Sequence, residues 1–411
     1  MSIRFVTIVT HVENLELRKD PGQVPYHIGN SYKDFSASLV TYYYTLKGGR
    51  HEGPVDIPPQ DSEQQHKDYP FLHSEVNGLQ LQFLPHKGRG KFYERAVLSY
   101  LLKNSKQIDV LNLFHFNAEN IFYTLLFKLL HPKGKVYIKL DIDICFYKQN
   151  KYFFNTNSSY AWLKVILFTK IIQPLFFRLV HTISAETQEG YRYFIKRFNV
   201  PLKKMLLLSN GVDENRISEC VTINKNFQQK ENIIITVGKI GTRQKNNEML
   251  LDTLNGIELK DWKVYFIGSI EPSFYNTINN FYKKYPAYSE SVFFTGKIDD
   301  PNKLYEYYNK AKIFCMTSEN ESFCIAAAEA AFFGNYLILT DTIPSFEQLT
   351  NNGLHGKKIK LNDTIELKET LQKLIDDEIL LSNNYDAMKN YSSKYLTWQS
   401  IIPILNKKLK N

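Results

Sequence analysis

The sequence lacks several patterns that would each define a class of protein. No GxGxxG follows the first predicted strand, and the basic loop at 86–92 lacks the GxxxxGK[ST] spacing of a P-loop. These absences argue against a nicotinamide-dependent dehydrogenase and against a P-loop. No HExxH is present, and the triplet Asp141-Ile142-Asp143 has none of the acidic neighbours of a metal-dependent transferase. We therefore expect neither a metal nor a cofactor.

Cysteines and long apolar runs are also scarce. The four cysteines have no metal-ligand spacing and no secreted-scaffold density, so we expect reduced thiols in the cytosol. The opening MSIRFVTIVT reads as a short strand and not as a signal peptide. No apolar run approaches the ~18–20 residues of a membrane span. The sequence thus predicts a cytoplasmic protein, or one at the inner face of the cell membrane.

One apolar segment leaves two alternatives open. Residues 159–180 (SYAWLKVILFTKIIQPLFFRLV) carry three basic residues among aromatic and aliphatic ones. The pattern fits a buried helix broken at Pro174. It also fits an amphipathic helix that lies in a membrane interface.

Acidic residues are too few in the first half of the chain to balance the basic ones. Residues 1–205 contain 27 Lys and Arg against 17 Asp and Glu, whereas the remaining residues contain 24 against 25. Such an excess favours an anionic partner: nucleic acid, acidic lipid or a lipid-linked diphosphate. Solvated lysines explain it equally well. Because no nucleic-acid-binding module is recognisable, we expect no nucleic-acid partner.

The length and the order of the patterns predict two domains. A chain of 411 residues exceeds one ordinary domain. Strand-like apolar runs alternate with helical stretches in both halves, which indicates an α/β fold. Asn210-Gly211 forces a tight turn near mid-chain. We expect a first domain at 1–207 and a second at 208–392.

The most informative stretch runs from residue 317 to residue 341 (TSENESFCIAAAEAAFFGNYLILTD). A polar turn precedes an Ala-rich helix that contains Glu329, and Glu321 stands eight positions earlier. On a helix this spacing corresponds to a rise of roughly 12 Å. Three backbone N–H groups between the two carboxylates would be donors of the helix N-terminus, suited to a phosphate: those of Ser322, Phe323 and Cys324. The same strand–loop–helix–strand unit occurs in every open α/β domain.

A second loop concentrates positive charge. The stretch GKIGTRQKNNEMLLDTL follows the predicted strand 233–237 and carries Lys239, Arg243 and Lys245 close to the start of a helix. Basic side chains at a helix N-terminus are a favourable arrangement for a diphosphate.

The Glu-x7-Glu pattern, with its Ser- and Glu-rich lead-in and the Gly, apolar strand and Thr-Asp after it, resembles the donor-site signature of the retaining glycosyltransferases of family 4. The NGVD at 210–213 resembles that family's crossing between domains, and the resemblance is specific over roughly 206–350. It implies the GT-B fold: two Rossmann-like α/β domains whose parallel sheets face each other across a cleft. It also implies that the C-terminal helix, here within 393–411, crosses back to the first domain.

The resemblance implies roles for the second-domain residues. Glu321 would hold the sugar hydroxyls and face the developing oxocarbenium ion, and Glu329 would accept hydrogen bonds from the ribose. Lys245 and Arg243 would bind the diphosphate. Lys239 would assist them, although it stands where the family has Arg, so that a bidentate contact is lost. Ile298, in a loop that begins at Gly296, would lie at the nucleotide base.

The first domain offers three further candidates. Gly22, in a turn formed by Asp20-Pro21-Gly22, would approach the donor diphosphate. Asp141 lies near the end of the predicted strand 135–143, where many family members have a His that contacts the donor sugar or sits close to the reacting carbon, and His115 ends the preceding strand. We therefore treat both Asp141 and His115 as catalytic candidates. A turn glycine, a capping Asp and a structural His are equally good descriptions of these residues.

The resemblance implies transfer of a hexose-type sugar from a nucleotide diphosphate, with UDP favoured, with retention and without a metal. The acceptor would be a glycan or a lipid-linked molecule in bacterial surface-polysaccharide synthesis, and the basic first domain would contact an anionic membrane peripherally. Ser322 and Cys324 replace family glycines, and Lys239 replaces the arginine. These departures leave open a catalytically silent GT-B partner subunit. A GT-B nucleotide-sugar epimerase is a further alternative.

Overall fold

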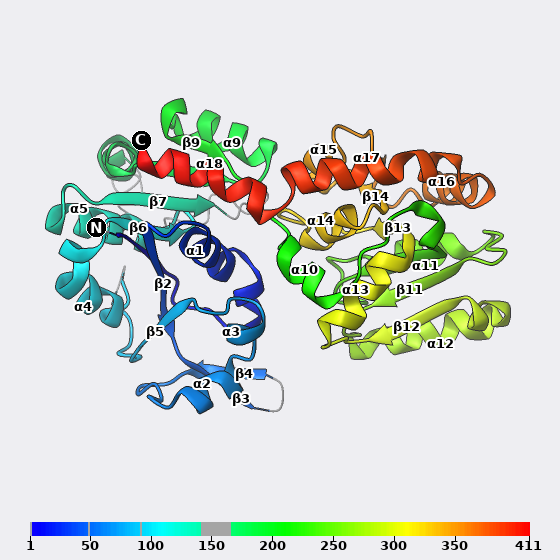
Figure 1. Cartoon of the computed structure of the whole chain (residues 1–411), viewed down its shortest axis with the longest axis horizontal. Helices are drawn as coiled ribbons and strands as arrows, with labels where there is room; N and C mark the ends of the chain where they lie inside the picture. Colours follow the sequence, from blue (N-terminus) through cyan, green and yellow to red (C-terminus); the bar gives the residue numbers. More distant parts are fainter. Residues whose placement is uncertain (1, 48–49, 91–92, 141–165) are drawn as a thin grey trace. The chain divides into compact units, whose positions relative to one another are not determined.

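The computed structural model describes residues 2–47, 50–90, 93–140 and 166–411 (Figure 1). The chain forms two compact units. The first comprises residues 1–186, 190–208 and 402–411, and the second comprises residues 187–189 and 209–401. Each unit is built on its own parallel β-sheet.

The sheet of the first unit has seven strands in the order β5-β2-β1-β6-β7-β8-β9, all paired in parallel. Parallel sheets are covered on both faces, so their strands are apolar throughout rather than alternating. All five residues of β6 (VLNLF) are buried accordingly. The strands are β1 (Ile3–Ile8), β2 (Phe35–Tyr42), β5 (Gln80–Leu84), β6 (Val110–Phe114), β7 (Lys135–Leu140), β8 (Thr182–Ala185) and β9 (Met205–Leu207).

Helices connect these strands, and an insertion lies between β2 and β5. The Asn117 side chain caps α5, accepting a hydrogen bond from the Asn120 N–H at 2.9 Å, and so fixes where the helix begins. The connecting helices are α1 (Asp20–Ser31), α4 (Arg95–Asn104), α5 (Ala118–Leu130), α8 (Gln173–Leu179) and α9 (Gln188–Phe198). The insertion holds the hairpin β3 (Tyr44–Lys47) and β4 (Arg50–Pro54) with α2 (Ser62–Asp68) and α3 (Phe71–Ser74).

The predicted turn at Asp20-Pro21-Gly22 is wrong. These residues form the first turn of α1, where Pro21 loses nothing by lacking an N–H. A Cβ on Gly22 would lie 2.3 Å from the Leu17 carbonyl oxygen in the preceding short helix η1 (Asn14–Arg18). Close packing of α1 on η1 therefore accounts for the glycine. Its proposed approach to a diphosphate stays a prediction.

The apolar segment predicted at 159–180 lies within the described residues only from 166 onward. Residues 166–179 are helical through a π-type turn (Phe168–Ile172) and α8, so the predicted break at Pro174 is wrong. Phe176 and Phe177 are buried, whereas four aliphatic side chains on the same helical segment are exposed: Ile166, Leu167, Ile171 and Leu175. In the parts of the chain described, no helix is both long and apolar enough to span a membrane.

The second unit has a six-stranded parallel sheet in the order β12-β11-β10-β13-β14-β15. The order runs outward from β10 in both directions, which defines a Rossmann-like doubly wound sheet. The strands are β10 (Glu231–Val237), β11 (Lys263–Ile267), β12 (Val292–Gly296), β13 (Ala311–Met316), β14 (Tyr336–Thr340) and β15 (Gly356–Ile359). The helices are α10 (Glu214–Cys220), α11 (Asn247–Leu254), α12 (Tyr275–Lys284), α13 (Pro301–Lys310), α14 (Ile325–Phe332), α15 (Phe346–Leu349), α16 (Thr364–Asp376) and α17 (Ile379–Tyr395).

The last helix, α18 (Trp398–Lys410), begins in the second unit and belongs to the first from residue 402 onward. Figure 1 shows it in red, and its far end packs within the first unit. Leu405 and Leu409 are buried, and the Leu409 carbonyl accepts a hydrogen bond from Lys135 Nζ at 2.5 Å. The predicted return of the C-terminal helix to the first domain is confirmed.

A buried ionic triad joins α1 to the sheet of the first unit. Lys139 Nζ, at the end of β7, lies 2.5 Å from Asp20 Oδ2 and 3.2 Å from Glu186 Oε1. It also donates to the Leu208 carbonyl at 3.3 Å. All three charged side chains are at most 5% exposed. Burial alone would lower the pKa of Lys139, but the two carboxylates overcome this effect and raise it.

Replacing Lys139 with Met should destabilise the first unit, because two buried carboxylates would lose their cation. Breaking such a pair costs about 3–5 kcal/mol. Since the folded-state pKa of Lys139 is raised, its contribution is complete below the unfolded lysine pKa of about 10.4 and is lost as the pH rises from there through the raised folded-state pKa. Hydrogen exchange of the β7 and β8 amides should therefore speed up in Lys139→Met at pH 7. Exchange should be unchanged in the exposed control Lys87→Met. Equal protection of wild type and Lys139→Met would contradict the role of the triad.

Candidate functional site

The direction of the chain crossing reverses between β10 and β13 in the second unit. These two strands are neighbours, with β11 and β12 on one side and β14 and β15 on the other. In open parallel sheets, ligands bind beyond the carboxyl ends of the strands at such a switch point. The loops that leave β10 and β13 there are 238–246 and 317–324. They are the two loops that the sequence singles out.

Hydrogen bonds tie these two loops together. The Glu319 N–H donates to the Gln244 carbonyl at 2.8 Å, and Gln244 Nε2 donates to the Asn320 carbonyl at 3.1 Å. Thr317 Oγ1 donates to the Asn246 carbonyl at 2.9 Å. The two loops therefore form one layer above the switch point.

Lys245 and Glu321 make the central contact of this layer. Lys245 Nζ lies 2.5 Å from Glu321 Oε1, and the side chains are 18% and 11% exposed. Ser318 Oγ donates to the same oxygen at 2.8 Å. A Cβ on Gly238 would lie 3.2 Å from Lys245 Cε, so the glycine leaves room for the lysine chain. Ser318 was missed in the sequence, although its place three residues before Glu321 in a polar turn was a usable signal.

The helix after this loop starts later than predicted. α14 begins at Ile325, with Cys324 as its N-cap residue in a left-handed conformation (φ 69°, ψ 70°). Glu321 therefore lies in the loop and Glu329 in the helix, but the helical rise applies only from residue 325. The N–H groups of Ser322 and Phe323 precede the helix, so their description as helix-terminal donors is wrong. Their contact with a phosphate stays a prediction.

Glu329 is held by a residue that the sequence did not single out. Tyr308, on α13, is fully buried and donates from its hydroxyl to Glu329 Oε2 at 2.9 Å. Burial, with the Glu329 carboxylate beside it, raises the pKa of Tyr308, so the hydroxyl remains a donor. The two residues are 21 positions apart on different helices, so spacing alone could not reveal the pair.

Cys324 lies among the charged groups of the site. Burial raises the pKa of its thiol to about 12. The Glu321 charge adds to this rise, the Lys245 charge opposes it, and Glu329 contributes a smaller increase. The charges of both glutamates and of the lysine therefore all act on the Cys324 thiol.

The other two predicted cations pair with acids other than Glu321. Lys239 is paired with Glu271, in the loop after β11. Arg243 Nε lies 3.2 Å from Glu319 Oε2, and its side chain is 91% exposed. The structure thus brings Arg243 to the neighbouring acid of the 317–324 loop, whereas Lys239 turns to a third loop.

The loop after β12 reaches the same apolar cluster as the start of α14. Ile298 is partly buried and packs against a cluster that contains Phe323 and Cys324. Gly296 at the start of this loop has φ 71°, a conformation that glycine adopts without strain. Ile298 therefore packs on the same side of the second unit's core as Phe323 and Cys324, and its contact with a base stays a prediction.

In the first unit, the corresponding switch point lies between β1 and β6. His115 follows β6 with an exposed side chain and a left-handed backbone (φ 69°), and its N–H donates to the Lys139 carbonyl at 2.9 Å. Non-glycine residues in this conformation are uncommon and concentrate at functional sites. Asp141 lies outside the described residues. No group of three His, Cys, Asp or Glu that could hold a metal occurs among the residues described.

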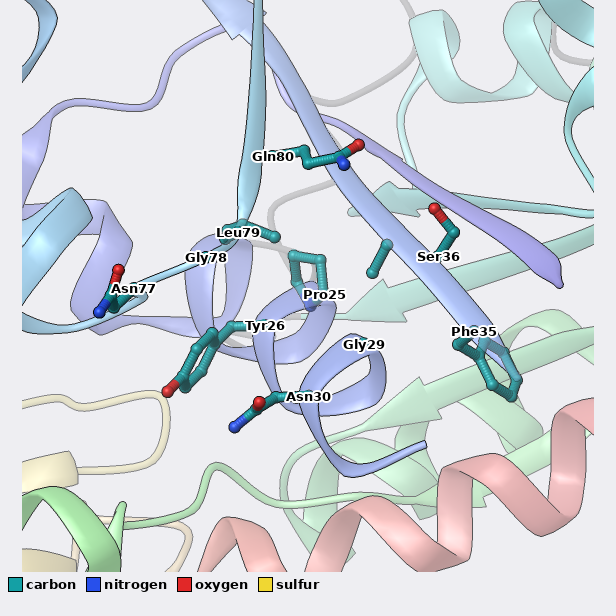
Figure 2. Close-up of a pocket in the computed structure, with 11 residues that line it drawn as sticks. Pro25, Tyr26, Gly29, Asn30, Phe35, Ser36, Asn77, Gly78, Leu79 and Gln80 are labelled. Carbon is teal, nitrogen blue, oxygen red and sulfur yellow. The ribbon is translucent and has the colours of Figure 1, made fainter. Parts of the chain in front are cut away.

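A cavity of about 260 Å³ occurs elsewhere in the first unit, between the end of α1 and the starts of β2 and β5 (Figure 2). Tyr26, Asn30, Asn77 and Gln80 are among its lining residues. It lies at the amino ends of the strands, and none of the predicted site residues lines it. We therefore assign it no part in the candidate site.

Comparison with known families gives a match over most of the second unit. Residues 222–395 match the family model described as "Glycosyl transferases group 1". This range contains both loops of the switch point and all of α14. No curated protein sequence matches the chain.

Solved structures identify the fold of the whole chain. HepE from Anabaena, solved in complex with UDP, superposes with a TM-score of 0.67 at 13% identity, covering 100% of both chains. Sucrose-phosphate synthase from Thermosynechococcus elongatus gives 0.64 at 13%, covering 99% of this chain and 98% of its own. The lipopolysaccharide outer core galactosyltransferase WaaB gives 0.64 at 12%, covering 99% of each.

At such low identity, these likenesses show the fold alone, and the predicted GT-B fold is confirmed. With the family match over the second unit, they support a GT-B glycosyltransferase.

The left-handed backbone conformation of Cys324 predicts which substitutions position 324 tolerates. A residue with a Cβ in the left-handed α conformation loses about 1–2 kcal/mol of stability, and a β-branched residue loses the most. Cys324→Gly should leave the melting temperature within a few degrees of wild type, whereas Cys324→Val should lower it clearly. Cys315→Val is the matched control, because Cys315 is equally buried but lies in the extended strand β13. Equal melting temperatures for Cys324→Val and Cys315→Val would show that the backbone at 324 is not strained.

Proposed function

We propose that this protein transfers a hexose-type sugar from UDP to a glycan or lipid-linked acceptor, with retention at the anomeric carbon and without a metal ion. The observation that carries the proposal is the Lys245–Glu321 contact at the switch point, with Glu329 following in α14. The family match over residues 222–395 supports glycosyl transfer. The likeness in fold to HepE, solved with UDP and with UDP-glucose, supports the choice of donor.

Lys245 would stabilise the leaving diphosphate. In the absence of ligand its ammonium group is neutralised by Glu321 at 2.5 Å. A bound diphosphate would bring its own negative charge to Lys245, and Glu321 would then be available to the sugar hydroxyls. A fixed ammonium group in a partly buried site stabilises developing negative charge without reorganising at the moment of reaction.

Glu321 and Glu329 would hold the two ends of the donor. Glu321 faces the positive charge that develops on the sugar as its bond to the diphosphate breaks. Glu329, oriented by the Tyr308 hydroxyl, accepts hydrogen bonds from the ribose. The acceptor hydroxyl forms the new bond to the anomeric carbon, and its proton passes to the leaving phosphate oxygen. His115 and Asp141 are the first-unit candidates for contact with the sugar or the acceptor.

The family resemblance and the charge of the chain extend the proposal to its setting. A lipid-linked acceptor would place the enzyme at the inner face of the bacterial membrane, in surface-polysaccharide synthesis. The excess of 27 Lys and Arg over 17 Asp and Glu in residues 1–205 favours peripheral contact with acidic lipid.

Nucleotide binding tests the donor first. In a thermal-shift panel of UDP, GDP, ADP and CDP without metal, UDP should raise the melting temperature most. Slow hydrolysis of UDP-glucose, followed by NMR, should then release the α anomer of glucose first, as retention requires. If all four nucleotides leave the melting temperature unchanged, with and without magnesium, the donor site is refuted and a silent partner subunit becomes the better description. Turnover of the donor to an epimer would favour an epimerase.

Removal of Glu329 should weaken donor binding. Glu329→Ala loses charge-assisted hydrogen bonds to the ribose, so the donor KM should rise about 10-fold or more. An unchanged KM would remove this role.

Tyr308→Phe deprives Glu329 of its orienting hydroxyl and should raise the donor KM by a smaller factor, with kcat little changed. Tyr307→Phe is the matched control on the same helix, because its ring packs on Tyr265 at 5.1 Å. A larger effect of Tyr307→Phe than of Tyr308→Phe would contradict a positioning role for Tyr308.

A further inference from the structure

Seven basic side chains line a cavity at the amino ends of β7, β8 and β9, here called the amino-edge pocket. Its volume is about 490 Å³, within the roughly 300–1,000 Å³ typical of ligand sites. No acidic side chain is among the described residues that line it. The basic residues are Lys128, Lys133, Lys135, Arg178, Lys203, Lys204 and Lys408.

Three of these lysines donate hydrogen bonds to backbone carbonyls and so help to hold the fold together. Lys204 Nζ donates to the carbonyls of Arg178 and Val180 at 2.6 and 2.5 Å, at the end of α8. Lys135 Nζ donates to the Leu409 carbonyl at the end of α18, and Lys128 Nζ to the Gly134 carbonyl just beyond α5. Three helix C-termini thus meet at the pocket, and lysines offset their negative ends.

The partial negative charges of the helix C-termini neutralise only a small share of the positive charge in the pocket. Each helix C-terminus carries about −0.5 of an elementary charge, or about −1.5 for three. The seven basic side chains therefore leave roughly five positive charges in excess. An excess of this size in a concave site favours a ligand with several negative charges.

Nearby carboxylates do not neutralise the excess positive charge of the pocket. Other lysines of this chain have acidic partners, as in the Lys410–Asp34 and Lys260–Asp376 pairs at 2.7 and 2.6 Å. Within the described part of the chain, none of the seven basic residues has a carboxylate within 4.0 Å. His181 also lines the pocket. Its pKa is lowered to about 4, mainly by burial and also by the positive charges of the lysines around it.

We propose that the amino-edge pocket binds a phosphate-bearing anion with at least two negative charges, such as a diphosphate, either free or as a lipid headgroup. Lys133, Arg178 and Lys203 are exposed and hold no helix end, so they remain available to the ligand. The site is distinct from the donor site, because its lining residues all belong to the first unit. The proposal therefore does not depend on glycosyl transfer.

Two exposed leucines are sequence neighbours of lysines that line the pocket. Leu129 is 79% exposed and follows Lys128, and Leu202 is 67% exposed and precedes Lys203. Apolar side chains beside a basic site can enter the headgroup region of a bilayer. Binding of a lipid headgroup would involve contact of these leucines with the bilayer, whereas binding of a free anion would not.

The experiment uses the full chain and two probes. Inorganic pyrophosphate is titrated calorimetrically, and flotation is measured with vesicles of neutral lipid with and without anionic phospholipid. Lys133→Ser/Lys203→Ser should weaken binding about 30-fold, at the usual contribution per basic residue. Lys67→Ser/Lys87→Ser is the control, because it removes equal charge from exposed positions outside the pocket.

Pyrophosphate binding that is lost in Lys133→Ser/Lys203→Ser identifies a free anion as the ligand. Flotation that needs anionic lipid, is lost in the same variant and also falls in Leu129→Ser/Leu202→Ser identifies a headgroup. If wild type binds neither probe, or if both lysine double variants lose binding equally, the amino-edge pocket is not a site.

Discussion

The Lys245–Glu321 contact is the interaction on which the candidate site depends. It joins loops that leave two adjacent parallel strands, at the point where the winding of the sheet reverses. Ser318 fixes the carboxylate, and Gly238 leaves space for the lysine chain. Because both charged groups are largely withdrawn from water, their attraction is stronger than that of an exposed pair. The geometry of the site is therefore set before any ligand arrives.

Such a preformed pair also imposes a cost on ligand binding. On the proposed function, an incoming anion would have to compete with Glu321 for the ammonium group of Lys245, so part of the binding energy would go into exchanging partners. Arg243 and Lys239 are likewise engaged by acids, but at exposed positions where ion pairs contribute little. Lys245 is thus the more tightly held cation, whereas Lys239 and Arg243 pair with other acids at exposed positions.

The sequence predicted the regular elements well and the contacts between distant residues poorly. The apolar strands and the Ala-rich helix that contains Glu329 were recognisable, because apolar runs and helix propensity are local properties. The start of α14 was misplaced, because Cys324 adopts a conformation that its residue type disfavours. The turn at Gly22 was misread, because its packing against Leu17 is a tertiary contact. Tyr308 and the buried triad around Lys139 could not be inferred, since their partners are far apart in the sequence.

The path of α18 has a consequence for synthesis. The first unit needs residues 402–411 to cover it, and these leave the ribosome only after the entire second unit has been made. During that interval the surface that will receive Leu405 and Leu409 is uncovered. Exposed apolar surface on a nascent chain invites aggregation and chaperone binding. The two units are therefore coupled in their biogenesis, and the unit made first is the one completed last.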